Sequence, residues 1–213
     1  GLVGYWPFDE GSGNIAKDYS GNGNNAVFKN MSPTWVSGIF GNALRFQGDG
    51  TLDSRVEALD KPWYKTNTVT LVIWYKWLGS IDGWTSIFGR IAYGCCGAFG
   101  FTLRNFSGDH QWLTQTDGSV RFCDQGFGVS PDNNFHFLAG TYDINTGIKK
   151  FYYDGNLKVT FNNCNQVLNS ATLSIYIGSG AANTGIVYIL DEARIYNRAL
   201  SDQEIKALYD ATK

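Results

Sequence analysis

The carboxylates and histidines of this sequence are too few and too poorly spaced for the common hydrolytic mechanisms. A retaining glycosidase needs two carboxyl groups about 5–5.5 Å apart. The nearest carboxylate pairs are Asp49 with Asp53, Glu57 with Asp60, and Asp191 with Glu192. Each pair fails on its spacing or on the alternation of side chains along a strand. Only His110 and His136 could serve a Ser/His/Asp triad, so we expect a protein that is not an enzyme.

Four cysteines, at positions 95, 96, 123 and 164, have chemistry of a different kind. A zinc site is excluded because the sequence has no C-x-x-C pair and only two histidines. A bond between Cys95 and Cys96 would close a strained ring, since a trans peptide holds their Cα atoms only about 3.8 Å apart. We favour separate disulfides from these two residues to Cys123 and Cys164, and buried free thiols in a cytosolic protein are the alternative. The even cysteine number indicates an oxidising, extracellular or cell-surface location.

The overall composition excludes several classes of protein. Of the 213 residues, 43% are hydrophobic, 15% aromatic and 17% charged, and the net charge is −2. Disordered chains are rich in charge and poor in aromatic residues, so this chain is not one of them. No apolar run approaches the roughly 18 residues that a membrane-spanning helix needs. The small net charge gives no attraction to nucleic acid or to an anionic membrane.

Short strands separated by Gly, Asn and Asp turns predict an all-β sandwich. Residues 69–77 form the longest apolar run and predict a central strand. Asp117-Gly118 predicts a two-residue hairpin turn. The further predicted strands are 135–142, 148–153, 157–161, 172–178 and 185–193.

One helix is predicted near the end of the chain. Ser201 and Glu204 have the spacing of a capping box. Leu200, Ile205 and Leu208 form an apolar stripe that would pack against one edge or end of the sandwich. The sequence contains no linker, repeat or low-complexity tract, so residues 1–213 are predicted to form a single domain.

Five sequence patterns point to one family. They are GYWPFDEGSG at 4–13, DYSGNGNNA at 18–26, GIFGNALRF at 38–46, FHFLAGTYD at 135–143 with FYYDG at 151–155, and LDEARIYNRALS at 190–201. In this order they resemble the laminin-G-like, concanavalin A-like jelly-roll domains, with no match from about 78 to 130. The resemblance implies two antiparallel sheets with a concave face. It also implies binding to glycans or other proteins in secreted or cell-surface chains, often with a structural calcium ion.

The loop from Asp18 to Asn25 is the candidate calcium site. It offers one carboxylate, three Asn side chains including Asn24, and two glycines that allow carbonyl groups to turn inward. The family resemblance favours Asp191 as the partner of Asp18, with Asp9 as a weaker third ligand. Because successive side chains on a strand point in opposite directions, only one of Asp191 and Glu192 is expected to face this site.

The alternative is an interpretation without a metal. In that reading Asp18 stabilises an Asx-type turn, and Asp191 pairs with Arg194 or Arg198.

A glycan-binding surface needs an aromatic platform and planar hydrogen-bonding groups. The segment from Gly79 to Gln125 is rich in both. Its candidate ligand-binding residues are Trp84, Tyr93, Arg104, His110, Trp112 and Asp124. Trp84 and Trp112 are expected to be more exposed than Trp74, whereas packing in the core is the ordinary role of any one of these aromatic side chains.

The expected function is therefore a non-catalytic, carbohydrate-binding or adhesion module that binds a glycan or a surface protein. The alternative is a structural or protein-interaction head domain of a pilus-like filament or surface layer. A polysaccharide hydrolase or lyase is the third possibility, since related folds host such enzymes.

Overall fold

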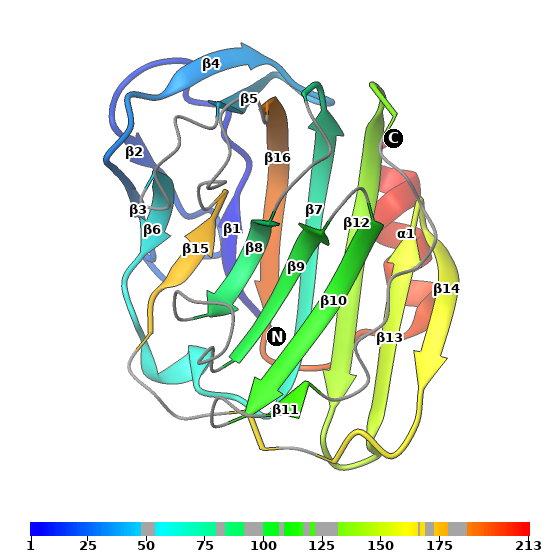
Figure 1. Cartoon of the computed structure of the whole chain (residues 1–213). Helices are drawn as coiled ribbons and strands as arrows, with labels where there is room; N and C mark the ends of the chain where they lie inside the picture. The colour runs from blue at the N-terminus through cyan, green and yellow to red at the C-terminus, as the bar shows by residue number, and fades with distance from the viewer. Residues whose placement is uncertain are drawn as a thin grey trace.

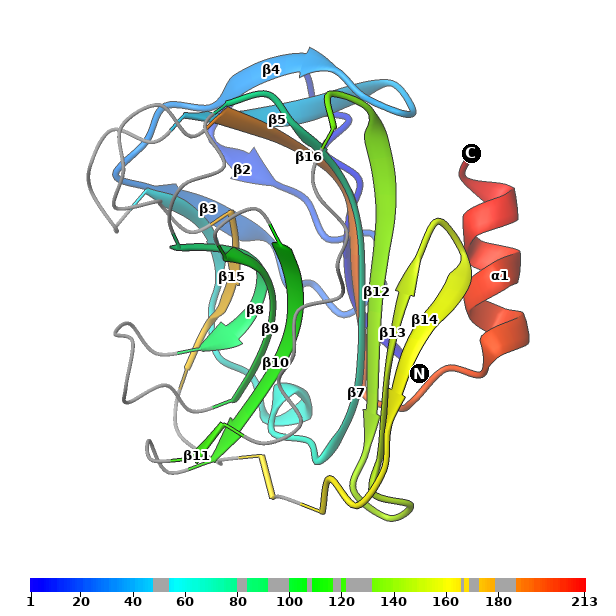
Figure 2. The same ribbon diagram turned by 45° about the vertical axis from the view of Figure 1, so that its right-hand side comes forward.

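The computed structural model of the chain is a sandwich of two antiparallel sheets (Figure 1; Figure 2). The structure describes residues 1–47, 54–79, 84–91, 100–106, 109–116, 120–121, 132–165, 167–168, 173–178 and 187–213. Within these residues each sheet has eight strands, which confirms the predicted jelly-roll class. Figure 2 shows the two layers edge-on, with the C-terminal helix outside one of them.

We call the sheet that carries this helix sheet A. Its order is β14-β13-β12-β7-β16-β5-β4, and β1 also pairs with β16. The strands are β14 (Asn156–Phe161), β13 (Ile148–Tyr153), β12 (Phe135–Asp143), β7 (Thr68–Trp77), β16 (Val187–Tyr196), β5 (Asn42–Gln47), β4 (Thr34–Ser37) and β1 (Leu2–Trp6). β7 matches the predicted central strand and lies between β12 and β16.

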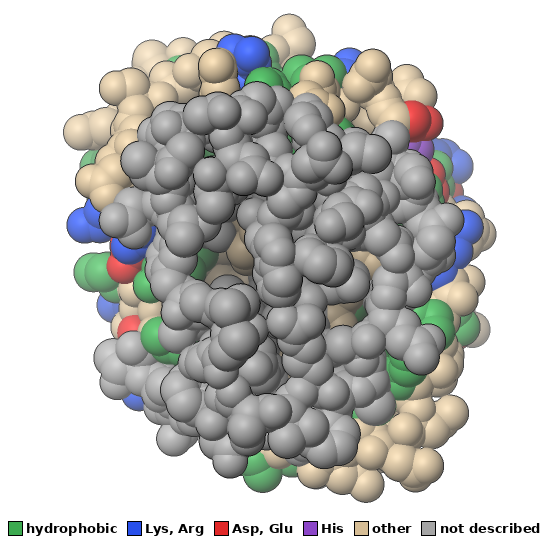
Figure 3. Space-filling view, in the orientation of Figure 1, with side chains coloured by type: hydrophobic (Ala, Val, Ile, Leu, Met, Phe, Trp, Pro, Cys, Tyr) green, Lys and Arg blue, Asp and Glu red, His purple; other side chains and the backbone are tan. Residues whose placement is uncertain are grey.

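Sheet B has the order β11-β10-β9-β8-β15-β6-β3-β2. The strands are β11 (Val120–Arg121), β10 (Asp109–Thr116), β9 (Gly100–Phe106), β8 (Trp84–Ile91), β15 (Ile175–Ile177), β6 (Arg55–Ala58), β3 (Ala26–Lys29) and β2 (Ile15–Ala16). A 3-10 helix, Pro62–Tyr64, precedes β7. In Figure 3, which looks onto the side of sheet B, described basic, acidic and hydrophobic side chains lie interspersed along the margin.

The first and last strands lie side by side. β1 pairs antiparallel with β16, with Tyr5 opposite Arg194 and Trp6 opposite Ala193. Side chains from both strands enter the main core between the sheets, among them Trp6 of β1 and Ile195 of β16. Alternate residues of β1 and β16 therefore point to the outer face of sheet A.

Helix α1, Asp202–Ala211, covers a second apolar cluster on that outer face. The predicted capping box is confirmed, since Ser201 and Glu204 exchange side-chain and backbone hydrogen bonds. Tyr209 stacks on Trp74 with ring centroids 5.7 Å apart, and Trp74 Nε1 donates to Thr212 Oγ1 at 3.0 Å. Within the described residues, no helix combines the length and the apolar character needed to cross a membrane.

Candidate functional site

A β-bulge in β16 places two neighbouring carboxylates on the same face. The pairing of β16 with β7 shifts register between Asp191 and Arg194, and Glu192 has a φ of 57°. Such a φ is unusual for a residue with a side chain. Both Asp191 and Glu192 are buried on the outer face of sheet A. The two carboxylates share a face because the bulge interrupts the alternation of side chains along the strand.

Asp191 holds the turn between β4 and β5. Its Oδ2 accepts the backbone N–H of Ile39 at 2.8 Å and that of Phe40 at 3.4 Å. Its Oδ1 is buried without a hydrogen-bond partner. Burial raises the pKa of Asp191 from 3.8 to about 7, and the nearby charge of Glu192 adds to this effect while the two N–H donors oppose it.

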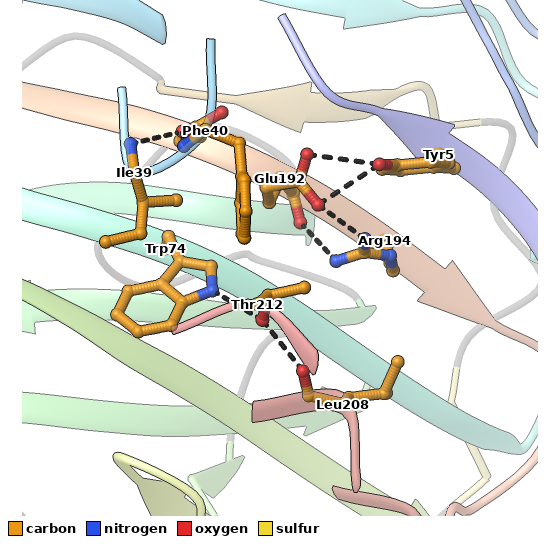
Figure 4. Close-up of polar contacts among 9 residues, drawn as sticks. Tyr5, Ile39, Phe40, Trp74, Glu192, Arg194, Leu208 and Thr212 are labelled. Carbon is orange, nitrogen blue, oxygen red and sulfur yellow. Dashed lines mark hydrogen bonds and ion pairs between the residues drawn. The ribbon is translucent and has the colours of Figure 1, made fainter. Parts of the chain in front are cut away.

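Glu192 is the centre of a compact polar cluster (Figure 4). Tyr5 donates its hydroxyl to both carboxylate oxygens of Glu192 at 3.1 Å. Arg194 forms an ion pair with the same carboxylate and lies over the Tyr5 ring, 4.2 Å from its centroid. Burial raises the pKa of Tyr5 to about 12 although Arg194 opposes the shift. Tyr5 is therefore a neutral donor at physiological pH.

Asp18 organises the loop beside this cluster. Its Oδ1 accepts the N–H of Tyr5 at 2.9 Å and that of Ser20 at 2.8 Å, and its Oδ2 accepts the Ser20 hydroxyl and the N–H of Asn24, both at 2.8 Å. This is the turn-stabilising role that the metal-free reading predicts. The loop presents Tyr19, whose ring meets Tyr5 edge-on at a centroid distance of 6.3 Å.

We define the outer-face site as the surface formed by Tyr5, Tyr19, Phe40, Glu192 and Arg194. Its charged groups are bonded to one another. The residues Tyr19 and Phe40 are exposed by 57% and 42%. The arrangement can offer aromatic contact surfaces beside a fixed polar network, and its carboxylate and guanidinium are already engaged.

The four predicted calcium ligands do not form one site. Both carboxylate oxygens of Asp18 already accept hydrogen bonds. The Asn24 side-chain amide donates to Val3 O at 2.6 Å. Asp191 holds Ile39 and Phe40, and Asp9 Oδ1 accepts the N–H of Asn42 at 2.9 Å. Among the described residues, no three acidic, His or Cys side chains gather as a metal site. Calcium binding stays a prediction, which melting with and without a chelator would test.

The alternative partners proposed for Asp191 are also wrong. Arg194 pairs with Glu192, and Arg198 pairs with Glu204 at 2.6 Å. Asp191 instead uses backbone donors from a loop 150 residues away in sequence, which no local pattern identifies.

Trp112 and His110 belong to the interior. Trp112 is fully buried. Its ring packs so closely against Gly140 that a Cβ atom added there would lie 2.5 Å from it. The indole Nε1–H donates to Thr141 O at 3.1 Å. His110 is also fully buried, with its ring 4.8 Å from that of Tyr75. The prediction that these two side chains contact a ligand is wrong, because sheet A covers the face of β10 from which they project.

The other predicted ligand residues fall outside what the structure describes. This holds for Tyr93 and Asp124, and for the side chains of Trp84 and Arg104 although their strands are described. Cys95, Cys96 and Cys123 also lie outside the described residues. Cys164 is buried and disulfide-bonded, while the pairing scheme stays a prediction.

Sequence reasoning did not select Tyr19, Phe40 or Tyr5 as ligand contacts. A signal was present for the first two. Tyr19 and Phe40 each stand in a short glycine-containing turn, DYSG and GIFG, where the chain has few neighbours to bury an aromatic ring.

Comparisons with solved structures show the same fold in toxin binding domains. The binding domain of Paraclostridial Mosquitocidal Protein 1 aligns with a TM-score of 0.77 and 16% identity, over 99% of this chain and 52% of that one. The binding domain of botulinum neurotoxin DC aligns in two complexes. The complex with rat synaptotagmin II gives a TM-score of 0.76 and 15% identity over 100% of this chain and 52% of that one. The complex with SialylT gives a TM-score of 0.75 and 15% identity over 100% of this chain and 51% of that one.

The chain spans about half the length of these binding domains. No curated protein matches it by sequence. A family model, described as the concanavalin A-like lectin/glucanases superfamily, matches residues 49–206. This match covers most of the chain, including the segment from 78 to 130 in which the sequence patterns found no resemblance. The chain therefore belongs to the concanavalin A-like lectin/glucanase superfamily.

Proposed function

We propose that this chain is a non-catalytic, extracellular module that binds glycans through the outer-face site. The proposal rests on one observation: Tyr19 is an exposed aromatic ring on a loop that is already fixed in place. A sugar presents an apolar C–H face, which an exposed aromatic ring can cover. Since the loop is ordered by four hydrogen bonds to Asp18, little conformational entropy is lost on binding.

Two further observations support the proposal. The fold is shared with toxin binding domains, one of which was solved in complex with SialylT, and low charge with abundant aromatic residues suits recognition of a neutral surface. The disulfide at Cys164 supports an oxidising compartment. An extracellular or cell-surface location is therefore part of the proposal.

A glycan array with the purified chain tests this function. We expect binding to a defined glycan class, and we expect Tyr19→Ala to weaken it at least tenfold without changing the melting temperature. Leu59→Ala is the matched control, because Leu59 is 61% exposed and lies outside the site. This control should bind like the unmodified protein.

Three outcomes would count against the proposal. Silence across a broad array would remove the glycan-binding function and favour the head-domain alternative, which self-association would then support. Equal binding by Tyr19→Ala and the control would move the contact surface away from the outer-face site. Release of reducing ends from a polysaccharide would show an enzyme.

A further inference from the structure

The exposed aromatic rings of the described residues are confined to one surface. The large hydrophobic side chains with high exposure in that part of the chain are Ile15, Tyr19, Phe40, Leu59, Leu78, Leu157 and Val167. Tyr19 and Phe40 are the aromatic members of this set, and both belong to the outer-face site. Most of the other described aromatic rings belong to the two cores or pack against them.

The two rings are carried by separate, independently fixed loops. The N–H of Tyr19 donates to Tyr5 O at 2.8 Å, in addition to the bonds that Asp18 makes within its loop. The Phe40 turn is closed by a bond from Gly38 N to Gly41 O at 3.1 Å and is held from below by Asp191. Each ring is therefore presented in a defined position before any ligand arrives.

The polar cluster separates the two rings. Tyr5 lies opposite Arg194 in the sheet, whereas Phe40 is bonded to Asp191, three residues earlier on β16. Because of the bulge, Asp191 and Arg194 pair with Trp74 and Val72, which are two residues apart on β7. At about 3.3 Å per residue this places the two attachment points roughly 7 Å apart along the strand. The Tyr19 ring packs edge-on against the Tyr5 ring, with 6.3 Å between the ring centroids. A pyranose ring is about as wide as a phenyl ring, so one sugar can cover only one of the two rings.

We propose that the ligand is an extended glycan chain that crosses β16, with one sugar on Tyr19 and a later sugar on Phe40. This inference rests on the proposed function and names the class of glycan: an oligosaccharide or an internal stretch of polysaccharide, several sugars long. Between the two contacts the chain passes over Tyr5, Glu192 and Arg194.

The surface fits a sugar chain better than a folded protein. Protein interfaces have a contiguous, largely apolar centre. Here two single rings flank a charged cluster, and both are at loop positions. Alternating apolar faces and hydroxyl groups along one molecule are a property of a glycan chain.

Isothermal titration with homologous oligosaccharides tests the inference. The probes are cello-, xylo-, manno- and chito-oligosaccharides of two to six sugars, with the unmodified chain, Tyr19→Ala and Phe40→Ala. For the series that binds, we expect the affinity of the unmodified chain to rise at least tenfold from the disaccharide to the hexasaccharide. Each variant should lose that length dependence while a weak affinity for the disaccharide remains on the other ring.

Leu157→Ala is the control, because Leu157 is 43% exposed, similar to Phe40, but lies on β14. It should keep the full length dependence. Binding that is equally strong for two and six sugars, or that Phe40→Ala leaves unchanged, would overturn the extended-chain inference and leave glycan binding intact. Absence of binding in all four series would overturn the extended-chain inference, and the glycan array would decide separately whether the proposed function stands.

Discussion

Asp191→Asn should remove a large part of the pH dependence of stability. In the folded chain the buried carboxyl has a pKa of about 7, against 3.8 for the ordinary side chain. The difference is about three pKa units, and each unit corresponds to about 1.4 kcal/mol. Ionised Asp191 therefore lowers the free energy of unfolding by roughly 4 kcal/mol relative to its protonated form.

The direction of the effect follows from the protons bound in each state. Between about pH 4 and pH 7 the folded chain keeps a proton on Asp191 that the unfolded chain has lost. The free energy of unfolding contributed by this group therefore falls as pH rises through that range, by about 1.4 kcal/mol per pH unit. Asp132 and Glu204 have pKa values lowered to about 2 by hydrogen bonds with His136 and Arg198, so their opposite effects occur below this range.

Urea denaturation at half-unit steps from pH 4.5 to pH 8 measures this contribution. Asparagine keeps the shape of the side chain and does not ionise, so the variant should show a flatter profile than the unmodified chain. Asp210→Asn is the control, because Asp210 lies at the exposed end of α1 and its pKa is lowered by Lys206 and Lys213. Parallel profiles for Asp191→Asn and the unmodified chain would refute the reasoning.

Two further variants test the assignment of side chains. Trp112→Ala should lower the free energy of unfolding by about 3–5 kcal/mol, because it removes a buried indole and its hydrogen bond to Thr141; a normal melting temperature combined with lost glycan binding would contradict the core assignment. Ser201→Ala should lower it by about 1 kcal/mol, since it removes the N-cap of α1, and an unchanged thermal melt would show that the capping box contributes nothing.

The main elements could be predicted because their signals are local. The apolar run at 69–77 defines β7, and the four residues from Ser201 to Glu204 define the start of α1. Each of these predictions depends on the alternation, periodicity or order of nearby residues.

The candidate site could be predicted only in part. The loop containing Asp18 was selected, but for a metal, and its observed role is to hold a turn. Both carboxylates of β16 reach the same face because the strand bulges at Glu192, and a bulge depends on the register of the neighbouring strand. Trp112 is covered by sheet A, so its polar flanks in sequence did not indicate exposure.

The sequence by itself determined the class of the fold, the positions of several of its strands and of its terminal helix, and a low charge that argues against nucleic acid. It could do so because the alternation of apolar and polar residues that indicates a strand is a local property of the sequence. Only the tertiary structure decided which aromatic rings are exposed and which carboxylates share a face. The exposure of a side chain depends on what another layer places over it, and that layer comes from residues far away in the chain.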